Sequence, residues 1–408
     1  YYNTDWGGLP ALKKELQAIR DGGQVPMFYT DPILADDNTE LGHKYGPKYG
    51  LMNPFWKAGG YASKEKTPAG YVGSYGGWNM DLDCQWYQDF LVQQTTRIVR
   101  DTGVDGIRFD EFGHRGYTNY NTKHQQIFAE PGQNAWLQAI SLACKRVHES
   151  VDKIKPDFVL TAEFPGYDHL AANLEGAINY ESAQHIFDGF RPVPLNVFRF
   201  YFPEHKPFDL DNKSTSHGEE WRFWNASGAF GHLHPPIYHR ILKENGDAFG
   251  SHDVTPLVST LAEDIYANRF IGGNKTITLL YNDSGFTVDK PLIAAPVKSG
   301  FHYFDLLKGQ EIEPQNNLIS MKLHPDKVAA IALLPKVLSM SKSAEGWVVQ
   351  LSRALPNGVI SLCDADGAEL SRQSFTGTKV LLKAPADESA VYVKLFSGKY
   401  LVDAQTIK

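Results

Sequence analysis

The chain has 408 residues, of which 42% are hydrophobic and 21% charged, an ordinary balance for a globular protein with a large core and more than one domain. Its formal net charge of −7 leaves no surplus of cations to neutralise phosphates, so nucleic acid is excluded as an expected partner. No apolar run is long enough to cross a membrane, and Cys84, Cys144 and Cys363 are spaced too widely for a disulfide framework or a zinc site.

Helices and strands alternate over the first part of the chain. A helix is predicted to begin near Leu9 and to end at Gly22-Gly23, and a strand over 25–29 then leads to Asp31. The segment 32–79 is rich in Gly, Tyr and Trp and lacks periodicity, and loops of this length inside a domain are usually functional. Further helices are predicted over 81–102, 134–155 and 237–244, and further strands over 104–109, 158–163, 176–181, 195–202 and 221–225.

This alternation predicts a parallel α/β architecture. Carboxylates at the ends of predicted strands favour an eight-stranded (β/α)8 TIM barrel over an open sheet; they are Asp31, Asp110, Glu163 and Glu181. Only six strands can be counted, and the first helix begins almost at residue 1. We therefore expect the N-terminal strands of the barrel to be missing from this chain, and a preceding portion of the protein or a companion chain to complete the barrel.

After Phe270 the pattern changes to short alternating strands with Gly and Asn turns, which is typical of β-sandwiches. A Ser/Lys-rich join over 338–345 separates two such segments. The predicted domains are a catalytic barrel over 1–266, incomplete at its N-terminus, a β-sandwich over 267–337 and a small β domain over 338–408.

One stretch, from Gly106 to His114, carries charges that a purely structural strand would avoid. Arg108 and Asp110 lie two positions apart, so both side chains point to the same face of the strand. Opposite charges on a buried face must pair, and a barrel strand tolerates such a pair where it ends at a cleft. The two residues are therefore either a structural ion pair or part of a catalytic site.

A second carboxylate, Glu163, ends the next predicted strand. Two carboxylates on neighbouring strand ends suit glycoside hydrolysis, in which one is the nucleophile and the other protonates the leaving oxygen and then activates water. Arg108 would keep Asp110 ionised, as a nucleophile requires. The apolar strand before Glu163 would raise the pKa of that carboxyl, as a general acid requires.

The pattern Gly106-x-Arg108-x-Asp110-x-x-x-His114 resembles the second signature region of the α-amylase superfamily, glycoside hydrolase family 13. The flow of the chain around this region also resembles less characterised bacterial barrel hydrolases that combine features of the amylase and α-galactosidase groups. The resemblance implies a retaining glycoside hydrolase that cleaves α-linked glycosides through a covalent glycosyl-enzyme intermediate on Asp110. Glu163 would be the acid/base, while Arg108 and His114 would orient the nucleophile and the sugar.

The chain departs from the family pattern at other positions. The family carries a third carboxylate in an Asn-His-Asp motif, for which Asp253 and Glu204 are rival candidates here. The family's strand-three motif is absent, and Asp31 is only its positional analogue. Glu181 would bind substrate, or would act as the acid if the reaction follows the α-galactosidase layout. A carboxylate at a solvated strand end, without a role in the reaction, explains its position equally well.

Aromatic residues and histidines in the loops also have two explanations. Trp78 is a candidate for stacking on a sugar ring, as are Trp6, Trp56 and Tyr75, and core packing explains them about as well. Several histidines are interpreted as loop residues because they lack the spacing of metal ligands on a helix: His43, His169, His252 and the pair His232/His234. Neither a metal nor a cofactor is therefore expected.

Two other functions stay open at this point. The same nucleophile would serve a transglycosylase that passes the sugar to an acceptor, and a barrel that has lost activity would bind carbohydrate without cleaving it. The expected partner is in each case an oligosaccharide or polysaccharide. A secreted or periplasmic location is favoured over a cytoplasmic one.

Overall fold

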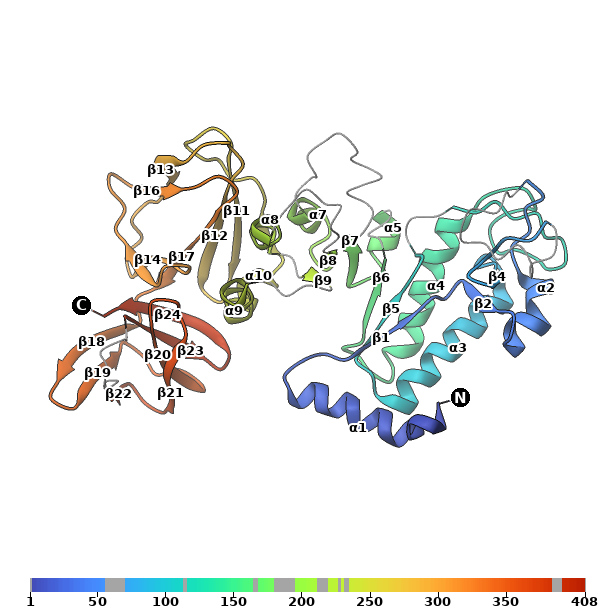
Figure 1. The fold of residues 1–408 in the computed structure, drawn as a ribbon, viewed down its shortest axis with the longest axis horizontal. Coiled ribbons are helices and arrows are strands. Elements are labelled where there is room, and N and C mark those ends of the chain that lie inside the picture. Colours follow the sequence, from blue (N-terminus) through green and yellow to red (C-terminus); the bar gives the residue numbers. More distant parts are fainter. Residues whose placement is uncertain are drawn as a thin grey trace. The chain divides into compact units, whose positions relative to one another are not determined.

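The computed structural model describes residues 2–55, 70–112, 116–163, 168–179, 195–210, 219–226, 229–230, 235–383 and 391–407. The chain forms two compact units (Figure 1). The first contains Tyr1–Ile186 and Glu204–Phe208, and the second contains Phe187–Pro203 and Asp209–Lys408.

The three helices predicted for the first unit are present as α1 (Gly8–Asp21), α3 (Gln85–Thr102) and α4 (Trp136–Val151). Two short helices were not predicted, η1 (Thr4–Trp6) and α5 (Asp168–Ala171). Helix α3 ends because Gly103 adopts the left-handed φ of 68°, which lets its N–H donate to the Val99 carbonyl. The chain can then turn directly into the next strand, which carries the Arg108/Asp110 pair.

The main sheet has the strand order β1-β5-β6-β7-β8-β9 (Figure 1). Its strands are β1 (Met27–Thr30), β5 (Gly106–Phe109), β6 (Val159–Ala162), β7 (Gly176–Asn179), β8 (Lys206–Leu210) and β9 (Ala229–Phe230). The pairs β1–β5, β5–β6, β6–β7 and β8–β9 are parallel, as the alternation of strands and helices predicts. The boundary between the two units falls within β8.

A closed barrel is not seen in the part of the chain that the structure describes. Among these residues no pairing joins β1 to β9. The predicted α/β class with a parallel sheet is therefore confirmed, whereas the closed eight-stranded barrel is not observed.

Two predicted strands are helices instead. Residues 195–202 contain α7 (Leu195–Tyr201), and residues 221–225 overlap α8 (Glu219–Trp224). Both segments are rich in aromatic residues, which favour strands on average, but in α8 Trp221 and Trp224 lie three positions apart and both are buried, a helical spacing. The strands of this region, β8 and β9, lie outside the predicted ranges.

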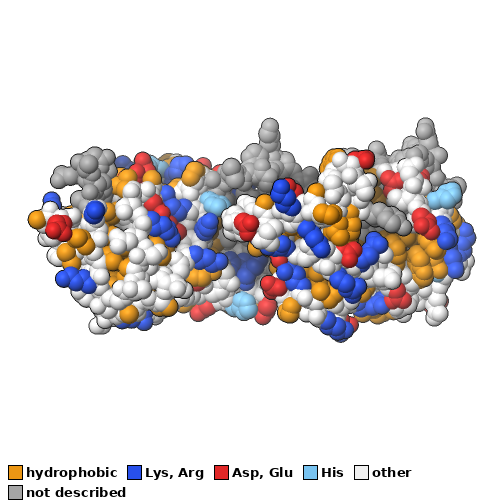
Figure 2. All heavy atoms as spheres, turned by 90° about the horizontal axis from the view of Figure 1, so that it is seen from below, with side chains coloured by type: hydrophobic (Ala, Val, Ile, Leu, Met, Phe, Trp, Pro, Cys, Tyr) orange, Lys and Arg blue, Asp and Glu red, His pale blue; other side chains and the backbone are white. Residues whose placement is uncertain are grey.

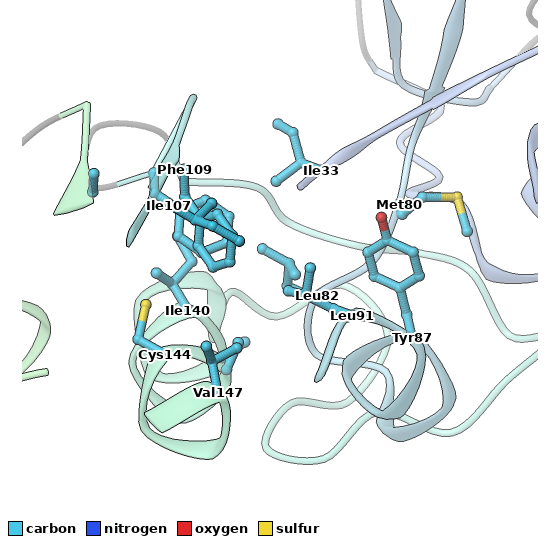
Figure 3. Close-up of a cluster of buried hydrophobic side chains, with 14 of the residues drawn as sticks. Ile33, Met80, Leu82, Tyr87, Leu91, Ile107, Phe109, Ile140, Cys144 and Val147 are labelled. Atoms are coloured by element: carbon cyan, nitrogen blue, oxygen red, sulfur yellow. The ribbon is translucent and has the colours of Figure 1, made fainter. Parts of the chain in front are cut away.

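The core of the first unit lies between β5 and the helix pair α3/α4. Ile107 and Phe109 of β5 point toward α4 and are almost fully buried (Figure 3). The residues of α4 that meet them are spaced by three or four positions and include Ile140, Cys144 and Val147. Because successive residues of a strand point to opposite faces, Arg108 lies on the face of β5 turned away from these helices.

The predicted long loop after β1 contains a small sheet with the order β2-β4-β3. Its elements are β2 (Leu34–Asp36), the π-helix η2 (Leu41–Tyr45), α2 (Gly46–Tyr49), β3 (Gly73–Ser74) and β4 (Gly77–Asn79). Trp78 of β4 is only 5% exposed, and its ring packs so closely on Gly46 that a Cβ there would lie 2.5 Å from it. In this structure the Trp78 ring packs in the core, and the contact of Trp78 with a sugar stays a prediction.

The second unit combines short helices with antiparallel sheets. Besides α7 and α8 it contains α9 (Pro236–Glu244), where a helix was predicted over 237–244, and α10 (Gly246–Phe249). One sheet has the order β10-β11-β12-β17-β14-β15 and is accompanied by the pair β13-β16. Two more sheets follow, β18-β19-β22 and β21-β20-β23-β24, as expected for the all-β part of the chain.

The bounds of these strands are β10 (Asp253–Thr255), β11 (Ile265–Gly272), β12 (Lys275–Asn282), β13 (Val288–Ala294), β14 (Phe301–Asp305), β15 (Gln310–Ile312), β16 (Leu318–Leu323) and β17 (Val328–Pro335). The C-terminal strands are β18 (Leu338–Ser343), β19 (Gly346–Leu351), β20 (Gly358–Cys363), β21 (Glu369–Phe375), β22 (Lys379–Leu382), β23 (Tyr392–Ser397) and β24 (Tyr400–Thr406). The division into three domains at residues 266 and 337 stays a prediction.

The surface mixes charges of both signs. On the face drawn in Figure 2, blue lysine and arginine side chains alternate with red acidic ones among the residues shown in colour. The three cysteines are all buried and free. Within the described ranges, no helix is both long and apolar enough to cross a membrane.

Candidate active site

Three carboxylates follow three neighbouring strands at one edge of the parallel sheet. The strand register pairs Thr30 with Phe109 and Phe109 with Ala162. The next residues along β1, β5 and β6 are Asp31, Asp110 and Glu163. The Asp110 N–H donates to the Thr30 carbonyl at 2.8 Å, which continues the pairing by one residue. The carboxyl ends of parallel strands therefore bring the predicted pair, Asp110 and Glu163, to adjacent positions.

Asp110 is held by two donors. Arg108 Nη2 lies 2.8 Å from Asp110 Oδ1, and the two side chains are 15% and 18% exposed. The Tyr29 hydroxyl donates to the other oxygen, Oδ2. The predicted pairing of Arg108 with Asp110 is thus present, and the two contacts fix the orientation of the Asp110 carboxyl group.

Tyr29 is a site residue that the sequence did not reveal. The register pairs Tyr29 with Arg108, and the guanidinium carbon lies 5.1 Å from the centre of the Tyr29 ring, within the range of a cation–π contact. Burial and the hydrogen bond to Asp110 raise the pKa of Tyr29, so its hydroxyl stays protonated and remains a donor at neutral pH. No local motif marks this tyrosine, and only the β1–β5 pairing places it beside Asp110.

Glu163 differs from Asp110 in its electrostatics. The pKa of Glu163 is raised to about 7, first by burial and then by the negative charges of Asp110 and Glu111, against the opposing effects of Arg108 and of a backbone hydrogen bond. That bond runs from the Glu111 N–H to Glu163 Oε2 at 3.0 Å. A large fraction of Glu163 is therefore protonated near neutral pH, as the apolar strand before it led us to expect.

These two carboxyl groups have complementary states. One is held by a cation and a phenol, and the other keeps its proton near neutral pH. Two neighbouring carboxyl groups in such different environments are the usual arrangement for nucleophilic and acid/base roles at one site. The pair therefore offers a fixed carboxylate and a protonated carboxyl group at neighbouring strand ends.

Asp31 lies near this pair. Its Oδ1 accepts a hydrogen bond from the Ile33 N–H at 3.1 Å, and its negative charge contributes to the raised pKa of Tyr29. Its role in binding substrate stays a prediction.

The two rival candidates for a third carboxylate do not fit the role. The exposed residue Glu204 precedes β8, and Lys206 donates to the Glu175 carbonyl at the start of β7. Glu204 therefore sits at the amino ends of the strands, the edge opposite Asp110. Asp253 is the first residue of β10 and pairs with Ile271 in an antiparallel sheet, so it does not end a strand of the parallel sheet. The sequence placed both by order along the chain, which could not reveal the helices before them.

Other predicted residues lie outside the described ranges: His114, Glu181, Trp56, and the pair His232/His234. Among the residues that the structure describes, no group of three or more His, Cys, Asp or Glu side chains is arranged to hold a metal ion.

Neither a protein-family model nor a curated protein sequence matches this chain. Solved structures do resemble it. The α-amylase from Geobacillus thermoleovorans, in complex with acarbose, aligns with a TM-score of 0.52 and 12% identity over 81% of each chain. A debranching enzyme from Nostoc punctiforme aligns with a TM-score of 0.54 and 11% identity, over 80% of this chain and 79% of that one.

An α-amylase from Anoxybacillus gives a TM-score of 0.51 at 13% identity, over 81% of this chain and 80% of that one. The likeness to the α-amylase group that the Gly106–His114 pattern predicted is thus present in three dimensions. At these identities it establishes an amylase-like fold, with a parallel α/β region followed by antiparallel sheets, and not an activity.

Proposed function

We propose that this protein is a retaining glycoside hydrolase that acts on α-linked glycosides. The observation that supports this most directly is the adjacent pair Asp110 and Glu163, one fixed by Arg108 and Tyr29 and the other with a pKa raised to about 7. The amylase-like fold agrees with the proposal, because enzymes of this fold are the neighbours found by structure.

The first chemical step uses both carboxyl groups. An Asp110 oxygen attacks the anomeric carbon as Glu163 donates its proton to the glycosidic oxygen, so that the carbon–oxygen bond to the leaving group breaks and a glycosyl ester forms on Asp110. Arg108 and Tyr29 hold the attacking carboxylate in place, so little reorganisation is needed.

The second step reverses these roles. Glu163, now ionised, takes a proton from a water molecule as the water oxygen attacks the same anomeric carbon, and Asp110 leaves as a carboxylate. The two displacements retain the configuration of the sugar. We infer that the substrate is an oligosaccharide or polysaccharide, the class to which acarbose binding by the Geobacillus enzyme points.

The test is the substitution Asp110→Asn, which keeps the shape of the side chain and removes the nucleophile. We expect kcat/KM on an α-glycoside to fall by at least about 1,000-fold, because a covalent nucleophile is not replaced by its neighbours. A fluorinated α-glycoside that traps the intermediate should add one sugar mass to the wild-type peptide carrying Asp110, detected by mass spectrometry.

The control is Asp101→Asn, which removes a carboxylate on α3 that accepts a hydrogen bond from Tyr2. This variant should keep its activity and its labelling. Full activity of a folded Asp110→Asn variant, or labelling at another residue, would refute the assignment.

A further inference from the structure

Glu111, the residue after Asp110, has an unusual backbone. Its φ of 60° lies in the left-handed region, which is strained for a residue with a Cβ. Glycine would adopt this conformation without strain. The side chain is also only 4% exposed, although glutamate is rarely buried. Backbone strain and burial of a carboxyl group both disfavour a glutamate at this position. Its presence beside a candidate nucleophile therefore indicates a functional role.

The left-handed conformation directs the Glu111 backbone toward the neighbouring strand end. Its N–H donates to Glu163 Oε2 at 3.0 Å. This contact links the second residue after β5 to the first residue after β6, across the pair of strands that lead to Asp110 and Glu163. It fixes one carboxyl oxygen of Glu163.

The charged groups that act on Glu163 belong to β5 and to the two residues after it. Asp110 and Glu111 contribute negative charge, and Arg108 contributes positive charge. Glu111 therefore acts in two opposite ways: its carboxyl raises the pKa of Glu163, while its backbone N–H lowers it by stabilising the ionised form. The two effects can be separated, because a substitution changes the side chain and keeps the N–H.

We propose that Glu111 is a positioning residue for Glu163: its backbone N–H fixes one oxygen of the Glu163 carboxyl, and its own carboxylate supplies negative charge that keeps Glu163 protonated. The consequence for catalysis rests on the proposed function, whereas the effect on the titration of Glu163 does not. Glu111 thus sets the pH above which the acid is lost.

The test uses two variants with different demands on the backbone. Glu111→Gln keeps the size of the side chain and removes its charge, and Glu111→Gly removes the side chain and tolerates the left-handed conformation. Without the negative charge the pKa of Glu163 should fall, so the protonated acid is lost at lower pH. We expect the alkaline limb of kcat/KM to move down by about one pH unit in both variants.

The matched control is Glu130→Gln, which removes the same charge from an exposed position. Its alkaline limb should coincide with that of the wild type. If the limb stays in place in both Glu111 variants, with melting curves that show them folded, the inference is overturned.

A second measurement separates this inference from the proposed function. In protein labelled with 13C at the glutamate carboxyls, the titration of Glu163 can be followed by NMR and assigned by its absence in Glu163→Gln. A lower pKa of Glu163 in the Glu111 variants supports the inference even if no glycoside is cleaved, in which case the proposed function alone has failed. An unchanged titration of Glu163 overturns the inference whatever the activity.

Discussion

At the scale of single residues, the site depends on contacts between strands more than on neighbours in sequence. Arg108, Asp110 and Glu163 could be predicted, because alternation along one strand and a carboxylate at the end of the next are visible in the sequence. Tyr29 could not, since its contact with Asp110 follows from a register that joins residues 81 positions apart. The role inferred for Glu111 likewise follows from a backbone angle that a glutamate rarely adopts.

The substitution Tyr29→Phe tests the contribution of the phenol. It removes the hydrogen bond to Asp110 and keeps the ring on which Arg108 stacks. A hydrogen bond to a charged group contributes about 1.5–3 kcal/mol, so we expect kcat/KM to fall by about tenfold or more. Steady-state kinetics on an α-glycoside measure this effect.

Tyr2→Phe is the matched control, because Tyr2 also donates to an aspartate, Asp101, at 3.0 Å. Its kinetics should equal those of the wild type. Equal kinetics for Tyr29→Phe would mean that Arg108 alone is sufficient to hold Asp110.

At the scale of elements, the long amphipathic helices and the buried strands were predictable and the aromatic segments were not. Helices α3 and α4 keep apolar residues at helical spacing over many turns, and Gly103 marks where α3 ends. Helices α7 and α8 have seven and six residues, too few for a helical period to outweigh the strand preference of their aromatic side chains. Their misassignment also misplaced the predicted third carboxylate, Glu204.

The contact between α4 and β5 should dominate the stability of the first unit. Ile140 of α4 is fully buried against the face of β5 that carries Ile107 and Phe109 (Figure 3). Ile140→Ala should lower the free energy of unfolding by about 2–5 kcal/mol, because it leaves a cavity in a packed core. Urea denaturation followed by tryptophan fluorescence measures the change.

Lys145→Ala, an exposed position on the same helix, is the control. It removes only an i,i+4 pair with Glu149 and should change stability by less than about 0.5 kcal/mol. Similar losses for the two variants would mean that α4 does not form this core.

At the scale of the whole molecule, an amylase-like fold is reached with only 11–13% sequence identity to the structures it resembles. The α/β region and the later antiparallel sheets could be predicted from the sequence, because they depend on hydrophobic periodicity and not on individual side chains. Whether the parallel sheet closes could not be read in this way. Closure depends on the tilt and stagger of the strands, which the hydrophobic pattern does not encode.

The raised pKa of Glu163 also affects the stability of the fold. The carboxyl has a pKa of about 7 in the folded protein and an ordinary value of 4.5. Between these values the folded state binds more protons than the unfolded state, so the free energy of unfolding falls as pH rises from about 4.5 to about 7. After allowance for partial solvent screening, the loss should be about 1–2 kcal/mol.

Urea denaturation of the wild type and of Glu163→Gln at pH 5 and pH 8 measures this dependence. The free energy of unfolding should change less between pH 5 and pH 8 in Glu163→Gln than in the wild type, by the amount that Glu163 contributes. An equal difference in both proteins would show that Glu163 titrates at its ordinary pKa.

The same carboxyl therefore makes folding a proton-coupled event. When the first unit folds at a pH near 6, Glu163 takes up a proton from the solvent as its side chain leaves water. In the folded site the proposed acid is thus already protonated, and this is the proton that the first chemical step consumes. As pH rises, the stability contribution of Glu163 is lost between about 4.5 and 7, and the proton itself leaves the folded site as pH passes through about 7. The loss of stability is therefore nearly complete where the loss of the acid is half complete.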